Sequence, residues 1–134
     1  MKALKSKVTK ALQIGSDLIV ADNSGAKRIR IIAVKRYKGL KKRRGKAGIG
    51  DIVICTVKDG PPDVKHKVFP FIIIRQVKEY KRQGGMRIKF EDNAAIMLKD
   101  LKNKEPKGTV IKGPVAKEVV ERFPHVSRIS SIVV

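Results

Sequence analysis

The apolar runs of this chain are short, and glycine, proline, asparagine or aspartate interrupts them at close intervals. This rhythm is typical of β-strands joined by turns, because these residue types supply the backbone conformations and side-chain bonds that turns need. The pattern therefore predicts an all-β fold. Several short strands in a compact chain fit either a closed barrel or a sandwich, and closure also removes exposed strand edges.

The first expected strands lie on either side of the turn sequence DNSG at 22–25. An apolar run at 18–20 precedes this turn, and a β-branched run at 28–34 follows it. Neighbouring side chains on a strand point to opposite faces, so Arg28 and Arg30 should face outward while the isoleucines beside them face the core.

The most apolar strand is expected at 51–58, where both faces carry apolar residues. It contains the single cysteine, Cys55, which has no partner for an internal disulfide and is expected to be a buried thiol. A loop with two prolines at 61–62 ends the strand. A second long apolar segment covers 68–77, where Pro70 indicates an edge position, a bulge or a late strand start.

A hairpin is expected further along the chain. Residues 86–90 alternate with period two, which would place Met86, Ile88 and Phe90 in the core. The run at 94–98 would pair with this strand across the turn at 91–93.

The two ends of the chain differ from this strand pattern. Residues 1–12 are expected to be extended, and 113–134 to form a short helical region that begins near Pro114 and is stopped by Pro124. Residues 127–134 fit either a last helical turn or a closing strand. Over residues 1–134 we expect a single domain, because the length is near the common domain size.

Charge defines the expected partner. Lys and Arg number 32 against 12 Asp and Glu, a formal net charge of +20 on a chain that is 42% hydrophobic. Such a charge opposes compaction and favours binding to anionic surfaces. Nucleic acid is preferred over a membrane, because no segment shows a convincing membrane-binding amphipathic helix or an apolar run of about 20 residues. No secretion signal is recognised, and a cytosolic location fits best.

The strongest binding signal is the basic segment KRYKGLKKRRGK at 35–46, which is glycine-rich and reads as a mobile loop between strands. Its cations would displace counterions from a phosphate backbone and position the protein without reading bases. The alternatives are a solvated loop without a ligand and a nuclear-import signal, which would require a nucleus. The candidate RNA-binding residues of this loop are Lys35, Arg36, Lys38, Lys41, Lys42, Arg43, Arg44 and Lys46.

A second basic group brackets Gly84-Gly85 and could share one surface. Tyr37 and Tyr80 could stack on bases beside these cations, although a chain with two Tyr, four Phe and no Trp is poorly supplied for stacking. The further candidate RNA-binding residues are Arg75, Lys78, Lys81, Arg82, Arg87 and Lys89, with Arg28 and Arg30 from the outward face of the strand at 28–34.

Enzymatic chemistry finds no support in the sequence. His66 and His125 are far apart, no metal-ligand cluster is recognised, and Ser24 lacks the flanking glycine of a nucleophile elbow. We therefore expect no catalytic residue, no metal, no cofactor and no small-molecule substrate.

Four motifs occur in order along the chain: VADNSGA at 20–26, GDIV at 50–53, RIKFEDNAA at 87–95 and GPVAKE at 113–118. With these motifs the chain resembles the universal large-subunit ribosomal protein fourteen family from about Gln13 to its C-terminus. The extended N-terminus and the segments 70–76 and 90–94 are more similar to the archaeal and eukaryotic branch than to the bacterial one.

The resemblance implies a small closed five-stranded β-barrel with short C-terminal helices, which binds large-subunit rRNA as a structural constituent of the large ribosomal subunit in the cytoplasm. It also implies contacts with small-subunit rRNA at intersubunit bridges, neighbouring large-subunit ribosomal proteins, and an anti-association factor that covers the same face. The bridge residues that it implies are Lys58, Asp59, Gly60, Pro61, Val119, Val120, Arg122 and Phe123.

Three functional hypotheses follow from the sequence. A ribosomal RNA-binding protein is preferred, a free RNA- or DNA-binding barrel comes second, and an enzyme comes third. The composition does not separate the first two, since both are basic barrels.

Overall fold

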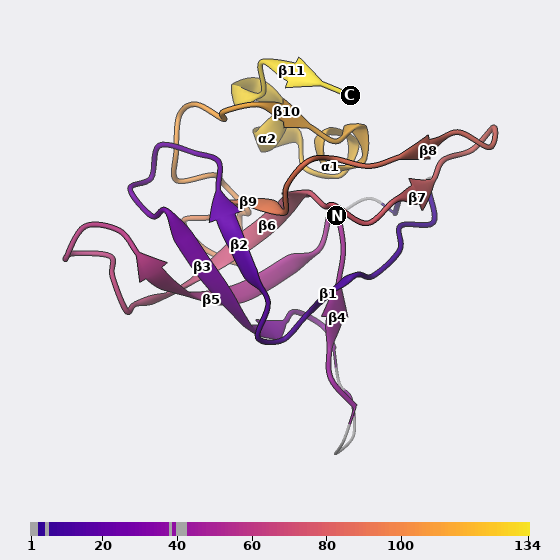
Figure 1. The fold of residues 1–134 in the computed structure, drawn as a ribbon. Coiled ribbons are helices and arrows are strands. Elements are labelled where there is room, and N and C mark those ends of the chain that lie inside the picture. Colours follow the sequence, from indigo (N-terminus) through magenta and orange to yellow (C-terminus); the bar gives the residue numbers. More distant parts are fainter. Residues whose placement is uncertain (1–2, 5, 38, 40–42) are drawn as a thin grey trace.

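The centre of the molecule is a closed barrel of five strands (Figure 1). A computed structural model describes residues 3–4, 6–37, 39 and 43–134. The barrel order is β2-β3-β5-β6-β9, in which neighbours are antiparallel except for β2 and β9, which close the barrel in parallel. The strands are β2 (Asp17–Val20), β3 (Arg28–Val34), β5 (Ile52–Asp59), β6 (Val68–Arg75) and β9 (Ala94–Met97). The predicted all-β fold with a closed five-stranded barrel is confirmed.

Alternation of side chains builds the first half of the barrel. On β3, Arg28 and Arg30 are exposed while the isoleucines that follow them are buried, as the sequence predicts. On β5, Val53, Cys55 and Val57 are fully buried. Ile54 is only half-buried, so β5 turns one face fully inward instead of being buried on both.

The second half of the barrel is buried on both faces. In β6 every residue from Phe71 to Arg75 is buried, as is every residue of β9. Pro70 pairs with Ile54 of β5 but precedes the ladder with β9, which starts at Phe71 opposite Met97. The nitrogen of Pro70 has no hydrogen to donate, and it lies just outside the ladder between β6 and β9, where no such hydrogen bond is needed.

The predicted hairpin between 86–90 and 94–98 is wrong. β8 (Arg87–Ile88) pairs instead with β7 (Tyr80–Lys81), and the two form an arm that projects from the barrel (Figure 1). The chain reverses at Gly84 and Gly85, both with positive φ, and Met86 beside them is 66% exposed. The core positions predicted for Ile88 and Phe90 are half-buried and buried, respectively.

The C-terminal region contains two short helices between two short strands. β10 (Pro114–Val115) precedes α1 (Lys117–Arg122) and α2 (Pro124–Ile129), and β11 (Ile132–Val133) returns in parallel to β10. The helix expected from Pro114 therefore starts three residues later, and Pro124 begins a second helix, because a proline fits the first turn of a helix. Near the other end, β1 (Leu12–Gln13) pairs with β4 (Lys46–Ala47).

Val53 and Ile54 allow a matched test of this core. We expect Val53→Asp to abolish cooperative folding, because an unpaired buried carboxylate costs several kcal/mol against a total stability of roughly 5 to 15 kcal/mol. Ile54→Asp, at a half-buried position one residue away, should remain folded with a lower melting temperature. Circular dichroism during thermal unfolding measures both, and equal melting temperatures would contradict the assigned face of β5.

Candidate nucleic-acid interface

The described ends of the basic loop at 35–46 project from the lower side of the barrel in Figure 1. They border a groove of about 720 Å³ that is lined by Lys10, Tyr37, Arg43, Arg44 and Lys46. The ring of Tyr37 is 43% exposed, and its hydroxyl donates a hydrogen bond to the carbonyl of Arg43 at 3.3 Å. Lys38, Lys41 and Lys42, also predicted here, lie outside the described residues.

The charges of this loop are crowded and unneutralised. Partial burial, and then the neighbouring charges of Lys104 and Arg36, lower the pKa of Lys35. Arg36, Arg43, Arg44 and Lys46 are exposed, and none of them forms an ion pair with a described carboxylate. The described part of the loop therefore offers four cations, Arg36, Arg43, Arg44 and Lys46, without an ion-pair partner among the described carboxylates.

The two arginines of β3 are differently placed, because carboxylates lie beside them. Nε of Arg30 lies 2.7 Å from Oδ1 of Asp17, and Nε of Arg28 lies 2.9 Å from Oδ2 of Asp59. The hydrogen bond from Arg30 holds the pKa of Asp17 below its usual range, although burial opposes it. Both arginines are exposed, but their charges are partly compensated on the barrel surface.

The arm brings several of the predicted cations together. Lys78, Lys81 and Lys89 are exposed, and no described carboxylate pairs with them. Nη1 of Arg87 lies 3.0 Å from Oε1 of Glu79. Tyr80 is 1% exposed, so the prediction that it stacks on a base is wrong.

Arg75 lies inside the fold, in contrast to the exposed cations of the second basic group. It is 7% exposed, and its Nε and Nη2 donate to the two carboxylate oxygens of Asp92 at 2.8 and 3.2 Å. Its Nη1 donates to the carbonyls of Lys112 and Pro114. Arg75 therefore joins β6 to the segment that leads into the C-terminal helices.

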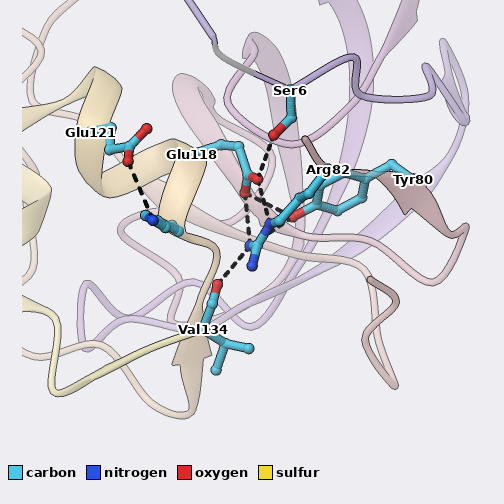
Figure 2. A network of polar contacts seen from close by, with 7 residues as sticks. Ser6, Tyr80, Arg82, Glu118, Glu121 and Val134 are labelled. Atoms are coloured by element: carbon cyan, nitrogen blue, oxygen red, sulfur yellow. Dashed lines mark hydrogen bonds and ion pairs between the residues drawn. The ribbon is translucent and has the colours of Figure 1, made fainter. Parts of the chain in front are cut away.

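A buried carboxylate holds the arm to α1 (Figure 2). Glu118 is 3% exposed and accepts hydrogen bonds from Ser6 Oγ at 3.1 Å and from the Tyr80 hydroxyl at 2.7 Å. Arg82 binds both of its oxygens, at 2.7 and 3.1 Å, and also donates to the carbonyl of Val134. The network joins the N-terminal segment, the arm, α1 and the end of the described chain.

Electrostatics in this network favour the charged form of Glu118. Burial alone would raise the pKa of its carboxyl group, but the hydrogen bonds from Arg82 and Tyr80 outweigh burial and hold the pKa below its usual value. The pKa of Tyr80 is raised, first by burial and then by the neighbouring carboxylate. Tyr80 therefore stays a neutral donor to an ionised Glu118 at neutral pH.

The residues predicted for intersubunit bridges lie in two places. Lys58 and Asp59 end β5, and Gly60 and Pro61 follow in the loop to β6. On α1, Val120 and Arg122 are half-buried, and Nη1 of Arg122 donates to the carbonyl of Gly50 at 3.3 Å. Val119 and Phe123 are buried at 0% and 2% exposure, so their side chains pack into the core and do not face outward.

Sequence reasoning missed the residues that assemble this surface. Lys7 and Lys10 come from the N-terminal segment, and Gln76 and Glu118 are buried polar side chains that join segments. For Glu118 a signal existed, because it stands three residues after Val115 and one before Val119, on the apolar face of the helical pattern. Lys7 carried no comparable signal.

Neither a metal-ligand cluster nor a helix able to cross a membrane occurs among the residues that the structure describes. No group of three or more His, Cys, Asp and Glu side chains in this part of the chain could hold a metal ion. None of its helices combines the length and the apolar character that a membrane crossing requires.

The fold and its surface thus define a small, strongly basic β-barrel protein. The family described as Ribosomal protein L14p/L23e matches residues 11–134 of this chain. The chain is 52% identical to the large ribosomal subunit protein uL14 of Nanoarchaeum equitans and 48% identical to that of Methanocorpusculum labreanum, in both cases over 100% of each chain. It is 50% identical to the same protein of Methanococcus vannielii over 99% of each chain.

The chain belongs to the ribosomal protein L14p/L23e family. This confirms the family resemblance read from the four motifs, and the three relatives are archaeal, in agreement with the predicted branch. The family is one of ribosomal structural proteins and not of enzymes.

The Glu118 network makes a pH-dependent contribution to stability that can be isolated. Because the folded-state pKa of Glu118 lies below its ordinary value of 4.5, its contribution is present above that pH and is lost as pH falls through the folded-state pKa. Glu118→Gln should therefore lower the free energy of unfolding at neutral pH, and the difference from wild type should shrink below pH 4.5. Urea unfolding across a pH series measures this difference, and a gap that stays constant under acid conditions would contradict it.

Proposed function

We propose that this chain is a structural constituent of the large ribosomal subunit that binds large-subunit rRNA and contributes to intersubunit bridges with small-subunit rRNA. The single observation that supports RNA binding best is the basic loop, whose exposed arginines and Lys46 have no carboxylate partner among the described residues. A net charge of +20 on a folded barrel favours binding to a polyanion, and phosphate groups supply one. Contacts of this kind position a protein on RNA without reading its sequence.

The proposed rRNA surface has two parts. The loop contributes Arg36, Arg43, Arg44 and Lys46, with the exposed ring of Tyr37 available for stacking. The arm contributes Lys78, Lys81, Arg87 and Lys89. Arg28 and Arg30 on β3 and Lys35 at the start of the loop are further proposed contacts. Arg75 and Arg82 are left out. All three guanidinium nitrogens of Arg75 donate to acceptors inside the protein, and Arg82 is bound to Glu118 and to the carbonyl of Val134.

The proposed bridge contacts come from the end of β5 and from α1. Lys58, Asp59, Gly60 and Pro61 are half-buried or exposed and stand where β5 passes into its connection to β6. Val120 and Arg122 are the half-buried members of α1, and Val119 and Phe123 would act by fixing the helix. On the same reasoning we propose a cytoplasmic location on the large subunit, with neighbouring ribosomal proteins and an anti-association factor as further partners.

Sedimentation separates this proposal from a free RNA- or DNA-binding barrel. The tagged full chain, expressed in an archaeal host, should migrate with large subunits through a high-salt gradient, because a ribosomal constituent is held by many phosphate contacts at once. Quantitative release as free protein under the same conditions would support the free barrel and overturn the ribosomal assignment.

Charge reversal in the loop gives the direct test of RNA binding. Arg43→Glu/Arg44→Glu should weaken binding to archaeal large-subunit rRNA and reduce the slope of log affinity against log salt by about one per arginine. The melting temperature of the free protein should hardly change, because exposed substitutions usually alter stability by no more than about 0.5 kcal/mol.

Lys65→Glu/Lys67→Glu is the matched control for this charge reversal. Both lysines are exposed and lie in the connection between β5 and β6. A loop variant that binds rRNA like this control would contradict the proposed role of the loop, and an unfolded loop variant would contradict its assignment as a loop.

A further inference from the structure

The N-terminal segment and the arm together form a groove, here called the N-terminal groove. Residues 6–10 form one wall, and residues 79–83 with Arg87 form the other. Its volume is about 690 Å³. Five cationic side chains and one carboxylate line it: Lys7, Lys10, Lys81, Arg82 and Arg87, with Glu79. Figure 1 places the N-terminal segment beside the arm, away from the β5–β6 connection.

Lys7 and Lys81 stand directly opposite each other across this groove. They are partners in an antiparallel bridge, and both are exposed. Like charges in this position destabilise strand pairing. Neither lysine forms an ion pair with any described carboxylate, whereas Lys10 binds Asp51, Arg82 binds Glu118 and Arg87 binds Glu79.

Buried polar side chains hold the two repelling walls together at both ends. At one end, Ser6 and the arm residues Tyr80 and Arg82 meet on the carboxylate of Glu118. At the other end, the fully buried Gln76 donates from Nε2 to the carbonyl of Thr9 at 3.1 Å and to that of Lys78 at 2.9 Å. Lys7 lies between these two attachments, and the buried Val8 anchors the segment beside it.

A close backbone approach makes room for the attachment through Gln76. Gly48 lies against the N-terminal segment, and a Cβ atom there would be 2.9 Å from the carbonyl oxygen of Thr9 and 3.1 Å from Oε1 of Gln76. The absent side chain of Gly48 therefore lets the segment reach Gln76. The Glu118 network and the Gln76 contact thus bring Lys7 to Lys81 against their mutual repulsion.

We propose that the N-terminal groove is a docking site for a phosphodiester strand of RNA, with Lys7 and Lys81 as paired phosphate ligands and with Glu118 and Gln76 as positioning residues. The proposal rests on the proposed rRNA binding and adds to it a separate site that includes the N-terminal segment. A phosphate between two lysines removes their repulsion, and lysine binds phosphate as a compact point charge. An extended anionic strand also matches a groove with cations along both walls.

The salt dependence of rRNA binding tests the two lysines. Lys7→Ala/Lys81→Ala should make the slope of log affinity against log salt shallower by about 1.4 to 1.8, since each phosphate contact contributes about 0.7 to 0.9. The control pair Lys65→Ala/Lys67→Ala removes the same charge in the β5–β6 connection and should change the slope much less. The probe is purified archaeal large-subunit rRNA with the full chain, over a series of KCl concentrations.

A cysteine pair tests whether the walls are held as the structure describes. Residues directly opposite in an antiparallel pair are about 4.5 to 5.5 Å apart at Cα, within disulfide range. Lys7→Cys/Lys81→Cys should therefore oxidise readily to one disulfide, while the buried Cys55 remains unreactive. Adding Glu118→Gln should slow this oxidation several-fold while the barrel keeps a cooperative melting transition, which distinguishes positioning of the arm from general destabilisation.

The outcomes separate this proposal from the proposed function. If Lys7→Ala/Lys81→Ala keeps the wild-type slope while Arg43→Ala/Arg44→Ala does not, rRNA binding stands and the groove proposal is overturned. If the lysine pair changes the affinity for a poly-glutamate peptide but not for rRNA, the groove is a protein-docking surface and the proposal is equally wrong. Failure of the wild-type chain to bind rRNA would overturn the proposed function itself.

Discussion

β2 and β9 meet in parallel, with Ile19 opposite Ala94 and Val20 opposite Ala95, and this contact closes the barrel. Closure leaves no barrel strand with a free edge. A long insertion must therefore lie in a connection between two barrel strands. The basic loop leaves between β3 and β5, and the arm leaves between β6 and β9, and in both cases the flanking strands are antiparallel neighbours. The barrel can therefore carry two long cationic insertions without losing a ladder of its own.

Three carboxylates of the chain stand at joints between segments. Asp92 joins Arg75 of β6 to the turn before β9, Glu118 joins the arm to α1, and Asp51 joins Lys10 to the start of β5. A buried charge needs a partner, because an unpaired one is costly, so these acids fix where the cations beside them lie. The loop and the tip of the arm contain few acids, and their cations remain available to an external polyanion. Charge thus serves two purposes in one chain, internal attachment and external binding.

The sequence predicts the features that neighbouring residues determine, and it does not predict those that depend on contacts between distant segments. The alternation on β3 and the burial of Cys55 follow from neighbouring residues, and both predictions are confirmed. Met86 was misplaced because a projecting arm and a barrel strand share the same period-two pattern, and only the closure of β9 onto β2 decides between them. The helical spacing around Val119 contained the signal for Glu118. Lys7 was unpredictable, because contacts of its neighbours Ser6 and Thr9 with residues far away in sequence place it beside Lys81.

Attachment of the N-terminal segment and binding of a polyanion are thermodynamically linked in this arrangement. The repulsion between Lys7 and Lys81 weakens the docked segment when no anion is present, and an anionic strand between them removes that repulsion. A ligand that binds only the docked form stabilises it in proportion to the logarithm of its concentration over its dissociation constant. Conversely, the hydrogen bonds of Gln76 and Glu118 order the groove before binding, which lowers the entropy that binding must overcome. The buried amide of Gln76 and the buried carboxylate of Glu118 would in this way increase the affinity for RNA without contacting the RNA.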